Sequence, residues 1–189
     1  MKFVIATLAL LICAAGTRAD QAQESSKAPN ALATIASLDV PRYMGTWYEV
    51  AKYPNRFQKM CTSDTRAEYQ LQPDGKVQVI NRCRLANGEM TEALGAARQI
   101  GSSQSPRLEV RFAPAWLSFI PMVWGSYWVI DLDTDYQLAA VSEPKREFLW
   151  ILSRTPQPNP AALQSLLARL TAQGFDLTKI ETSRQTTKP

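Results

Sequence analysis

Three cysteines, Cys13, Cys61 and Cys83, are the residues with the clearest capacity for covalent chemistry. A redox or catalytic pair of thiols is typically spaced as C-x-x-C, and this spacing is absent. The chain contains no histidine, which excludes histidine-based triads and histidine-ligated zinc. Glu49 and Glu92 are acids that could face a cavity, but no second group with a clear role accompanies them. We therefore expect no catalytic residue, no metal site and no cofactor.

The first nineteen residues predict an export signal, which decides how the cysteines are interpreted. Lys2 precedes an apolar run from Phe3 to Ala15 that is too short to span a bilayer, and small residues favour cleavage after Ala19. An uncleaved anchor and lipidation of Cys13 are the alternatives, but Ile12 is too large for the position before a lipidated cysteine. We therefore expect no lipid anchor.

Cleavage would leave Cys61 and Cys83 as the only cysteines, and two cysteines in an exported chain favour a disulfide bond. It would also leave 19 basic and 17 acidic residues, a net charge of +2. The basic residues are not clustered, so no nucleic-acid partner is expected.

Residues 20–37 have little periodicity and are predicted to form a flexible leader. From Leu38 onward, short segments of apolar and polar residues are separated by turn residues, as in an antiparallel barrel or sandwich. The predicted strands are Thr46–Tyr53, Arg66–Gln72, Val77–Arg84, Glu92–Ile100, Leu108–Phe112, Ser126–Leu132, Gln137–Ser142 and Phe148–Ser153.

One helix follows these strands. Asn159 is a suitable N-cap, Pro160 suits the first helical position, and Gly174 is a natural stop. Between them, Leu163, Leu166, Leu167 and Leu170 form a stripe that should pack the helix against the barrel wall. Phe175–Glu181 is predicted to be a further short strand.

Three segments resemble the motifs of the lipocalin family, in family order, with the closest likeness to its bacterial, apolipoprotein D-like branch. They are the Gly45-x-Trp47 segment, residues 132–136 and residues 149–156. The resemblance covers Leu38 to about Ser183 and implies an all-β, eight-stranded antiparallel up-and-down barrel with one C-terminal helix and a short final strand. The domain would span residues 38–183, with a tail at 184–189. It also implies export to the periplasm or outer membrane of a Gram-negative cell.

The resemblance assigns structural roles to the motif residues. Trp47 would close the narrow end of the barrel, and Arg154 would lie across its ring. Gly45 permits close backbone approach. Asp133 and Tyr136 belong to the second motif, in a turn between strands.

The resemblance and strand alternation together predict which residues line the barrel interior. If Trp47 faces inward, so does Ala51, and a slip of register by one residue would invert the whole set. The predicted ligand-binding residues are Ala51, Ala67, Tyr69, Val79, Asn81, Val110, Phe112, Tyr127, Phe148 and Trp150. A filled core without a cavity is the alternative.

The connection from Ala113 to Gly125 is almost wholly apolar, although connections normally lie on the surface. Trp116, Phe119 and Trp124 would form a lid over the barrel, a membrane contact or a contact in a homodimer. The predicted function is binding of a fatty acid, lysophospholipid or similar apolar molecule, for storage or transport at the cell envelope. An interaction module without a stored lipid and an enzyme that does not use cysteine are the alternatives.

Overall fold

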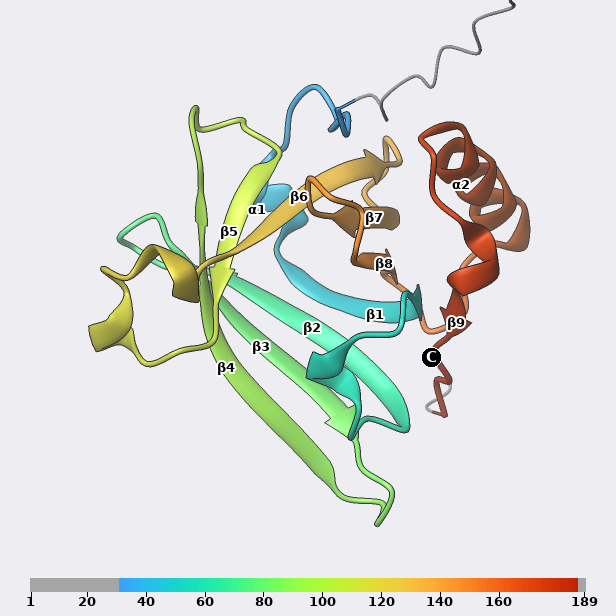
Figure 1. Cartoon of the computed structure of the whole chain (residues 1–189), viewed down its shortest axis with the longest axis horizontal. Helices are drawn as coiled ribbons and strands as arrows, with labels where there is room; N and C mark the ends of the chain where they lie inside the picture. The colour runs from blue at the N-terminus through green and yellow to red at the C-terminus, as the bar shows by residue number, and fades with distance from the viewer. Residues whose placement is uncertain (1–30, 187–189) are drawn as a thin grey trace, which may run out of the picture.

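The structure, a computed structural model that describes residues 31–186, is a closed antiparallel barrel with one long helix on its outside (Figure 1). Each strand pairs with the next, and β1 pairs with both β8 and β2, which closes the barrel. The predicted barrel is confirmed, and every predicted strand overlaps an observed one. The barrel strands are β1 (Gly45–Lys52), β2 (Ser63–Leu71), β3 (Val77–Arg84), β4 (Met90–Gln99), β5 (Arg107–Arg111), β6 (Gly125–Leu132), β7 (Leu138–Ser142) and β8 (Leu149–Ser153).

The short helix α1 (Val40–Tyr43) identifies one end of the barrel. Up-and-down pairing places the β2–β3, β4–β5 and β6–β7 connections at the same end. Just before α1, the Leu38 N–H donates to the Gln104 carbonyl in the β4–β5 connection. The Asp39 N–H donates to the Tyr136 hydroxyl in the β6–β7 connection. We call this the closed end and the opposite one the open end.

Helix α2 (Pro160–Ala172) packs on the outer wall, as its leucine stripe predicted. The Asn159 side chain accepts hydrogen bonds from the first helical N–H groups, and Leu166 and Leu170 are fully buried. Arg169 donates two hydrogen bonds to Asp131 of β6, at 2.7 and 2.8 Å. The apolar contact between helix and wall, the helix cluster, consists of Leu32, Val50, Ala51, Tyr53, Ile130, Leu138, Ala140, Leu149, Ile151, Leu166, Leu170 and Phe175.

A second apolar cluster fills the part of the barrel interior next to the closed end. Strand alternation separates it from the helix cluster, since neighbouring residues of β7 and β8 point to opposite sides of the wall. This lumen cluster consists of Leu38, Val40, Tyr43, Trp47, Ala67, Tyr69, Val77, Val79, Ala97, Leu108, Val129, Ala139, Val141 and Leu152.

The segment after α2 differs from its prediction as a strand. It forms a short 3-10 helix, η4 (Leu177–Lys179), and only then a two-residue strand, β9 (Glu181–Thr182). The Asp176 side chain caps η4 by accepting a hydrogen bond from the Thr178 N–H. β9 pairs with the open-end half of β1.

Residues on both sides of the predicted domain, 38–183, contact the barrel. In the predicted leader, Leu32 is buried under α2 and the Ile35 N–H donates to the Val129 carbonyl. In the predicted tail, Gln185 and Thr186 donate hydrogen bonds to β1 and β2. The predicted signal peptide, Cys13 and the leader up to residue 30 lie outside the described residues. Within residues 31–186, no helix is long and apolar enough to cross a membrane.

Candidate functional site

Arg154 and Trp47 form the base of the barrel at the closed end. Trp47 is fully buried, and the guanidinium carbon of Arg154 lies 4.0 Å from a ring centroid of Trp47. Arg154 also donates hydrogen bonds to the backbone carbonyls of Thr46, Arg42 and Tyr136. Gly45 has a φ of +93°, and a Cβ there would lie 3.3 Å from Arg154 Nη1. The motif residues therefore join β1, α1, the β6–β7 turn and the end of β8.

Asp133 and Tyr136 shape the β6–β7 turn at this base. The Asp133 carboxylate accepts hydrogen bonds from the N–H groups of Asp135, Gln137 and Leu138. Tyr136 has a positive φ of 58°, which lets its hydroxyl reach the N-terminal end of α1. Both residues hold the closed end together.

Ala51 does not line the lumen. The pairing of β1 with β8 shifts between Glu49 and Ala51, because β1 contains a bulge there. A bulge inserts one residue and reverses the alternation beyond it. Trp47 therefore faces the lumen while Ala51 belongs to the helix cluster. The prediction that the two residues share a face is wrong.

Six of the other predicted residues come together inside the barrel. Ala67, Tyr69 and Val79 belong to the lumen cluster, and Val110, Tyr127 and Trp150 pack against it. Asn81 is paired directly with Ala67, so it shares the inner face one layer above Tyr69 and Val79. Sequence alternation thus gives the correct face on β2, β3, β5 and β6.

The sequence prediction named no lumen residue on β4. Ala93 pairs with Asn81 and Gly95 pairs with Val79, so both lie on the inner face, as does the buried Ala97. A Cβ on Gly95 would lie 2.8 Å from the Phe112 ring, which shows that Phe112 lies over the β4 backbone. The sequence signal for this face is the small residue at every second position, Ala93, Gly95 and Ala97. Small side chains there leave space inside the barrel that larger ones would occupy.

Aromatic rings gather where β1 and β8 reach the open end. Phe148 stacks on Trp150 with centroids 5.7 Å apart, and Phe57 lies 5.6 Å from Phe148. Phe57 comes from the 3-10 helix η1 (Arg56–Gln58) in the β1–β2 loop. The Trp150 Nε1–H donates to the Gln58 side chain at 3.0 Å. Phe148 therefore flanks the opening, and Phe57 is a neighbour that the sequence prediction did not include.

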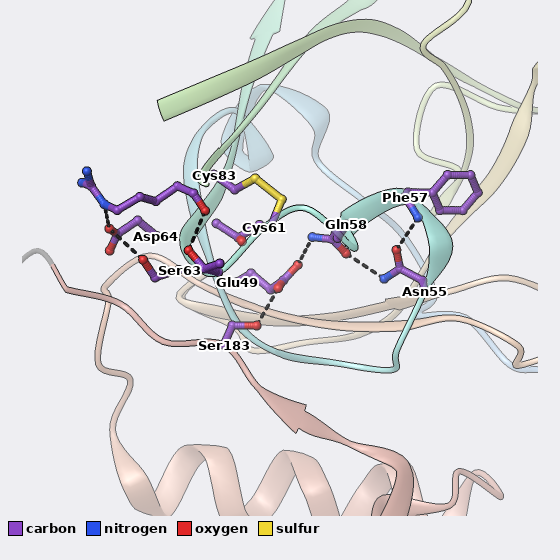
Figure 2. The surroundings of a disulfide bond; sticks show 12 residues. Glu49, Asn55, Phe57, Gln58, Cys61, Ser63, Asp64, Cys83 and Ser183 are labelled. Atoms are coloured by element: carbon purple, nitrogen blue, oxygen red, sulfur yellow. Dashed lines mark hydrogen bonds and ion pairs between the residues drawn. A yellow bond between two sulfur atoms is a disulfide. The ribbon is translucent and has the colours of Figure 1, made fainter. Parts of the chain in front are cut away.

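Glu49 connects this loop to the C-terminal segment, as Figure 2 shows. Glu49 is 2% exposed, and its carboxylate accepts hydrogen bonds from Gln58 and Ser183. Burial raises the pKa of the Glu49 carboxyl, and the two hydrogen bonds act in the opposite direction. Both oxygens are thus occupied by partners within the chain. Glu92, the other acid considered, forms an ion pair with Arg82 at 3.2 Å.

The predicted disulfide bond between Cys61 and Cys83 is confirmed, with the two Cα atoms 5.5 Å apart. It ties the β1–β2 loop to β3 near the open end (Figure 2). Beside it, the buried Asp64 accepts hydrogen bonds from Arg84 and from the N–H and hydroxyl of Thr186. Within residues 31–186, no group of three potential metal ligands is present.

Several inward-facing side chains remain partly accessible. Asn81, Val110, Tyr127 and Trp150 are neither fully buried nor fully exposed, and Ala93 is exposed. A side chain on the inner face of a closed barrel reaches solvent through the lumen. The part of the interior toward the open end is therefore not filled by side chains. Two shallow hollows on the surface, beside the β2–β3 turn and beside Tyr53, include none of the predicted ligand-binding residues.

The apolar β5–β6 loop protrudes from the barrel (Figure 1). It contains the 3-10 helices η2 (Ala115–Leu117) and η3 (Pro121–Val123). Trp116, Phe119 and Met122 are 72%, 77% and 91% exposed. Trp124 differs, because its ring packs against Arg98 at 4.1 Å and Arg111 at 5.2 Å. Trp124 therefore anchors the loop, and the exposed apolar surface is carried by the other three residues.

The family model of the lipocalin-like domain matches residues 38–185. This chain belongs to the lipocalin family. It is 40% identical over 157 residues to temperature-induced lipocalin-1 of Arabidopsis thaliana, covering 82% of this chain and 83% of that protein. It is 37% identical over 152 residues to the outer membrane lipoprotein Blc of Escherichia coli K12, covering 80% and 81%. It is 32% identical over 161 residues to apolipoprotein D of Mus musculus, covering 81% and 80%.

Solved structures agree on the fold of this lipocalin. Apocrustacyanin C2 matches with a TM-score of 0.61 at 16% identity, covering 79% of this chain and 81% of the other. Insecticyanin of the tobacco hornworm Manduca sexta matches with a TM-score of 0.60 at 19% identity, covering 84% and 90%. The closed base, the partly open interior and the family together indicate that this lipocalin binds a hydrophobic small molecule.

Proposed function

We propose that this lipocalin holds a fatty acid, lysophospholipid or similar apolar molecule in its lumen, for storage or transport at the cell envelope. The observation that carries the proposal is the partial accessibility of inward-facing apolar side chains above a closed base. Small residues on β2 and β4, Ala67 and Ala93, contribute to this space. Burial of a long acyl chain contributes about 0.8 kcal/mol per methylene group, before the costs of immobilisation.

Filling the lumen tests this proposal. Ala67→Trp places a large ring inside the barrel, whereas Leu94→Trp, the matched control, places one on the outer face of β4, where Leu94 is 58% exposed. We expect Ala67→Trp to abolish binding of palmitate and lysophosphatidylcholine, measured by calorimetry, while Leu94→Trp binds like the unmodified protein. Equal affinity in all three proteins would show that the ligand sits elsewhere.

A non-catalytic role fits the chemistry of the described residues. Cys61 and Cys83 are bonded to each other, so neither offers the free thiol that a cysteine nucleophile requires. Glu49 is enclosed by its hydrogen-bond partners, and Glu92 lies in an ion pair. Thiol titration of the oxidised mature protein checks the first point, and two titratable thiols would contradict it.

A second role, contact with a membrane, is supported by the β5–β6 loop. A lid would bury its apolar side chains, but Trp116, Phe119 and Met122 point into solvent. Three such side chains buried in lipid contribute several kcal/mol at about 25 cal/mol per Å². That is enough for reversible docking, which would let an apolar ligand pass between bilayer and barrel without crossing water.

A vesicle-binding experiment distinguishes membrane contact from ligand binding in the lumen. Replacing Trp116, Phe119 and Met122 with Ser should weaken flotation with phosphatidylglycerol–phosphatidylethanolamine vesicles and leave affinity for decanoate unchanged. Trp124 stays in place because it anchors the loop. If the unmodified protein does not float with vesicles, the membrane role is contradicted. Dimerisation through this surface would instead make the molecular mass of the unmodified protein in solution increase with its concentration.

Export to the envelope is proposed on two grounds: the predicted signal sequence, and the similarity to outer membrane lipoproteins. The prediction against lipidation of Cys13 gains no support from these relatives, since they are named lipoproteins. The mass of the mature N-terminal peptide from envelope fractions decides the matter. A peptide that begins at Asp20 indicates a free chain, and a lipid-modified peptide that begins at Cys13 indicates an anchor.

A further inference from the structure

Three tyrosines from separate elements meet at the floor of the lumen. Tyr43 comes from α1, Tyr69 from β2 and Tyr127 from β6. The Tyr127 hydroxyl oxygen lies 2.9 Å from that of Tyr43 and 2.9 Å from that of Tyr69. We call these residues the tyrosine triad. The Tyr43 ring also packs on Trp47, with centroids 4.8 Å apart, so the triad lies directly above the closed base.

The triad has more hydroxyl protons than hydrogen bonds between its members. Each phenol carries one proton, so the three hydroxyls supply three protons to two oxygen–oxygen contacts. Whichever way the two hydrogen bonds point, one proton has no acceptor among the described residues. A buried donor without a partner destabilises the folded protein, which favours a ligand or solvent oxygen at this place.

The unused donor faces the lumen when Tyr43 and Tyr69 both donate to Tyr127, because the free proton then belongs to Tyr127. Tyr43 and Tyr69 are 2% and 7% exposed, but Tyr127, the central member, is partly accessible. Tyr127 lies on the inner face, so its accessible surface opens toward the space above the floor. A molecule that enters from the open end would reach this surface with its leading end.

The floor favours a neutral group over an anion. Burial raises the pKa of Tyr69 to about 12 and raises the pKa values of Tyr43 and Tyr127 as well, because negative charge is poorly solvated there. Arg154 is the nearby cation, but Trp47 lies against it and its guanidinium donates to three backbone carbonyls. An ionised carboxylate would therefore lack a direct counter-charge at the floor.

We propose that the tyrosine triad is a polar subsite that donates one hydrogen bond to a neutral oxygen, such as a carbonyl or hydroxyl, at the leading end of an apolar ligand. This inference rests on the proposed function, since it requires a ligand in the lumen. Among apolar ligands, it singles out molecules with an uncharged terminal oxygen, inserted oxygen first, as those that gain this additional hydrogen bond. Ionised amphiphiles would lack this bond because their charged group remains at the opening.

The test uses 2-undecanone labelled with ¹³C at its carbonyl, in competition with the apolar dye N-phenyl-1-naphthylamine. In the unmodified protein, we expect the bound carbonyl stretch to lie below its position in hexane, as it does when an O–H group donates to it. A water-soluble paramagnetic agent should not increase the relaxation rate of the bound ¹³C-labelled carbonyl carbon, because this carbon lies at the floor and away from solvent. These two measurements need no variant.

The variant with Tyr43→Phe, Tyr69→Phe and Tyr127→Phe removes the triad without changing ring volume, and loss of all partners together is nearly neutral for folding. It should bind the ketone about 3- to 10-fold more weakly and lose the infrared shift, with dye affinity unchanged. Tyr48→Phe, on the outer face of β1, is the control. An unshifted carbonyl stretch in the unmodified protein, or an equal shift in the triple variant, would overturn the subsite. Dye binding would in that case still support the carrier function. Absence of dye binding to the unmodified protein would overturn both the subsite and the carrier function.

Discussion

The guanidinium of Arg154 lies on the ring of Trp47 at 4.0 Å, and it covers the floor of the barrel from outside. Its three backbone hydrogen bonds reach α1, β1 and the β6–β7 turn, so one side chain holds together segments more than 100 residues apart in sequence. The pair is therefore a structural closure below the ligand space, and its loss should act on stability first.

Replacement of Arg154 by Ala should lower the free energy of unfolding by about 1–3 kcal/mol, because the indole face is uncovered and three carbonyls lose their donor. The matched control is Arg42→Ala, since the Arg42 guanidinium lies over the Tyr136 ring but at the surface. We expect the control to cost about 0.5 kcal/mol. Urea denaturation measures both, and a stable Arg154→Ala protein that no longer binds ligand would contradict the structural role.

Loss of the disulfide bond should destabilise the barrel by about 3 kcal/mol, since Cys61 and Cys83 close a loop of 22 residues. The double variant Cys61→Ser and Cys83→Ser, compared with the oxidised protein in guanidinium chloride, gives this value. Reduction of the unmodified protein should produce the same change. If reduction alters neither the mass nor the stability, the bond is not formed in the mature protein.

Gly95 should tolerate no side chain. A Cβ there would lie 2.8 Å from the Arg111 carbonyl and the Phe112 ring, so Gly95→Ala must push β5 away from β4 and should cost about 1–3 kcal/mol. Gly125→Ala is the matched control, because the nearest atom outside its chain neighbours would be 3.8 Å away. Thermal unfolding of the two variants should separate them clearly. Similar melting temperatures would show that β5 shifts without cost.

Asp64 should make the protein sensitive to acid. Burial alone would raise the pKa of the Asp64 carboxyl, but hydrogen bonds from Thr186 and Arg84 outweigh it and hold that pKa well below its ordinary value. An acid with a lowered pKa in the folded state contributes stability that is complete above its unfolded pKa of about 3.9 and is lost as pH falls below it.

The Asp64→Asn variant tests this contribution, and Asn also tolerates the positive φ of 54° at this position. The difference in unfolding free energy between the unmodified protein and the variant should be constant above about pH 5 and shrink toward pH 2. Asp135→Asn, at an exposed turn position, is the control. A difference that stays constant down to pH 2 would show that Asp64 is not the acid-sensitive group.

Alternation and capping signals were sufficient for most of the fold. The apolar periodicity of β2, β3, β5 and β6 gave the correct inner face, and Asn159 with Pro160 gave the start of α2. Helix α1 cannot be predicted from the sequence, because four residues carry too little periodicity to distinguish a helical turn from a loop. The prediction of a strand after Gly174 is wrong for most of that segment, because a short apolar run is compatible with a strand or with the 3-10 turn that Asp176 caps.

The family, the barrel, the disulfide pair and the apolar character of the β5–β6 loop can be predicted from the sequence, since they depend on residue types and spacings along the chain. The face that Ala51 occupies depends on the tertiary structure, because the bulge in β1 arises from pairing with β8. The different positions of Trp124 and Met122 also depend on the tertiary structure. The cations that hold the Trp124 ring, Arg98 and Arg111, come from β4 and β5, whereas Met122 is 91% exposed. The tyrosine triad has the same origin: its hydroxyls are brought within hydrogen-bonding distance by closure of the barrel, and closure is a property of the whole sheet.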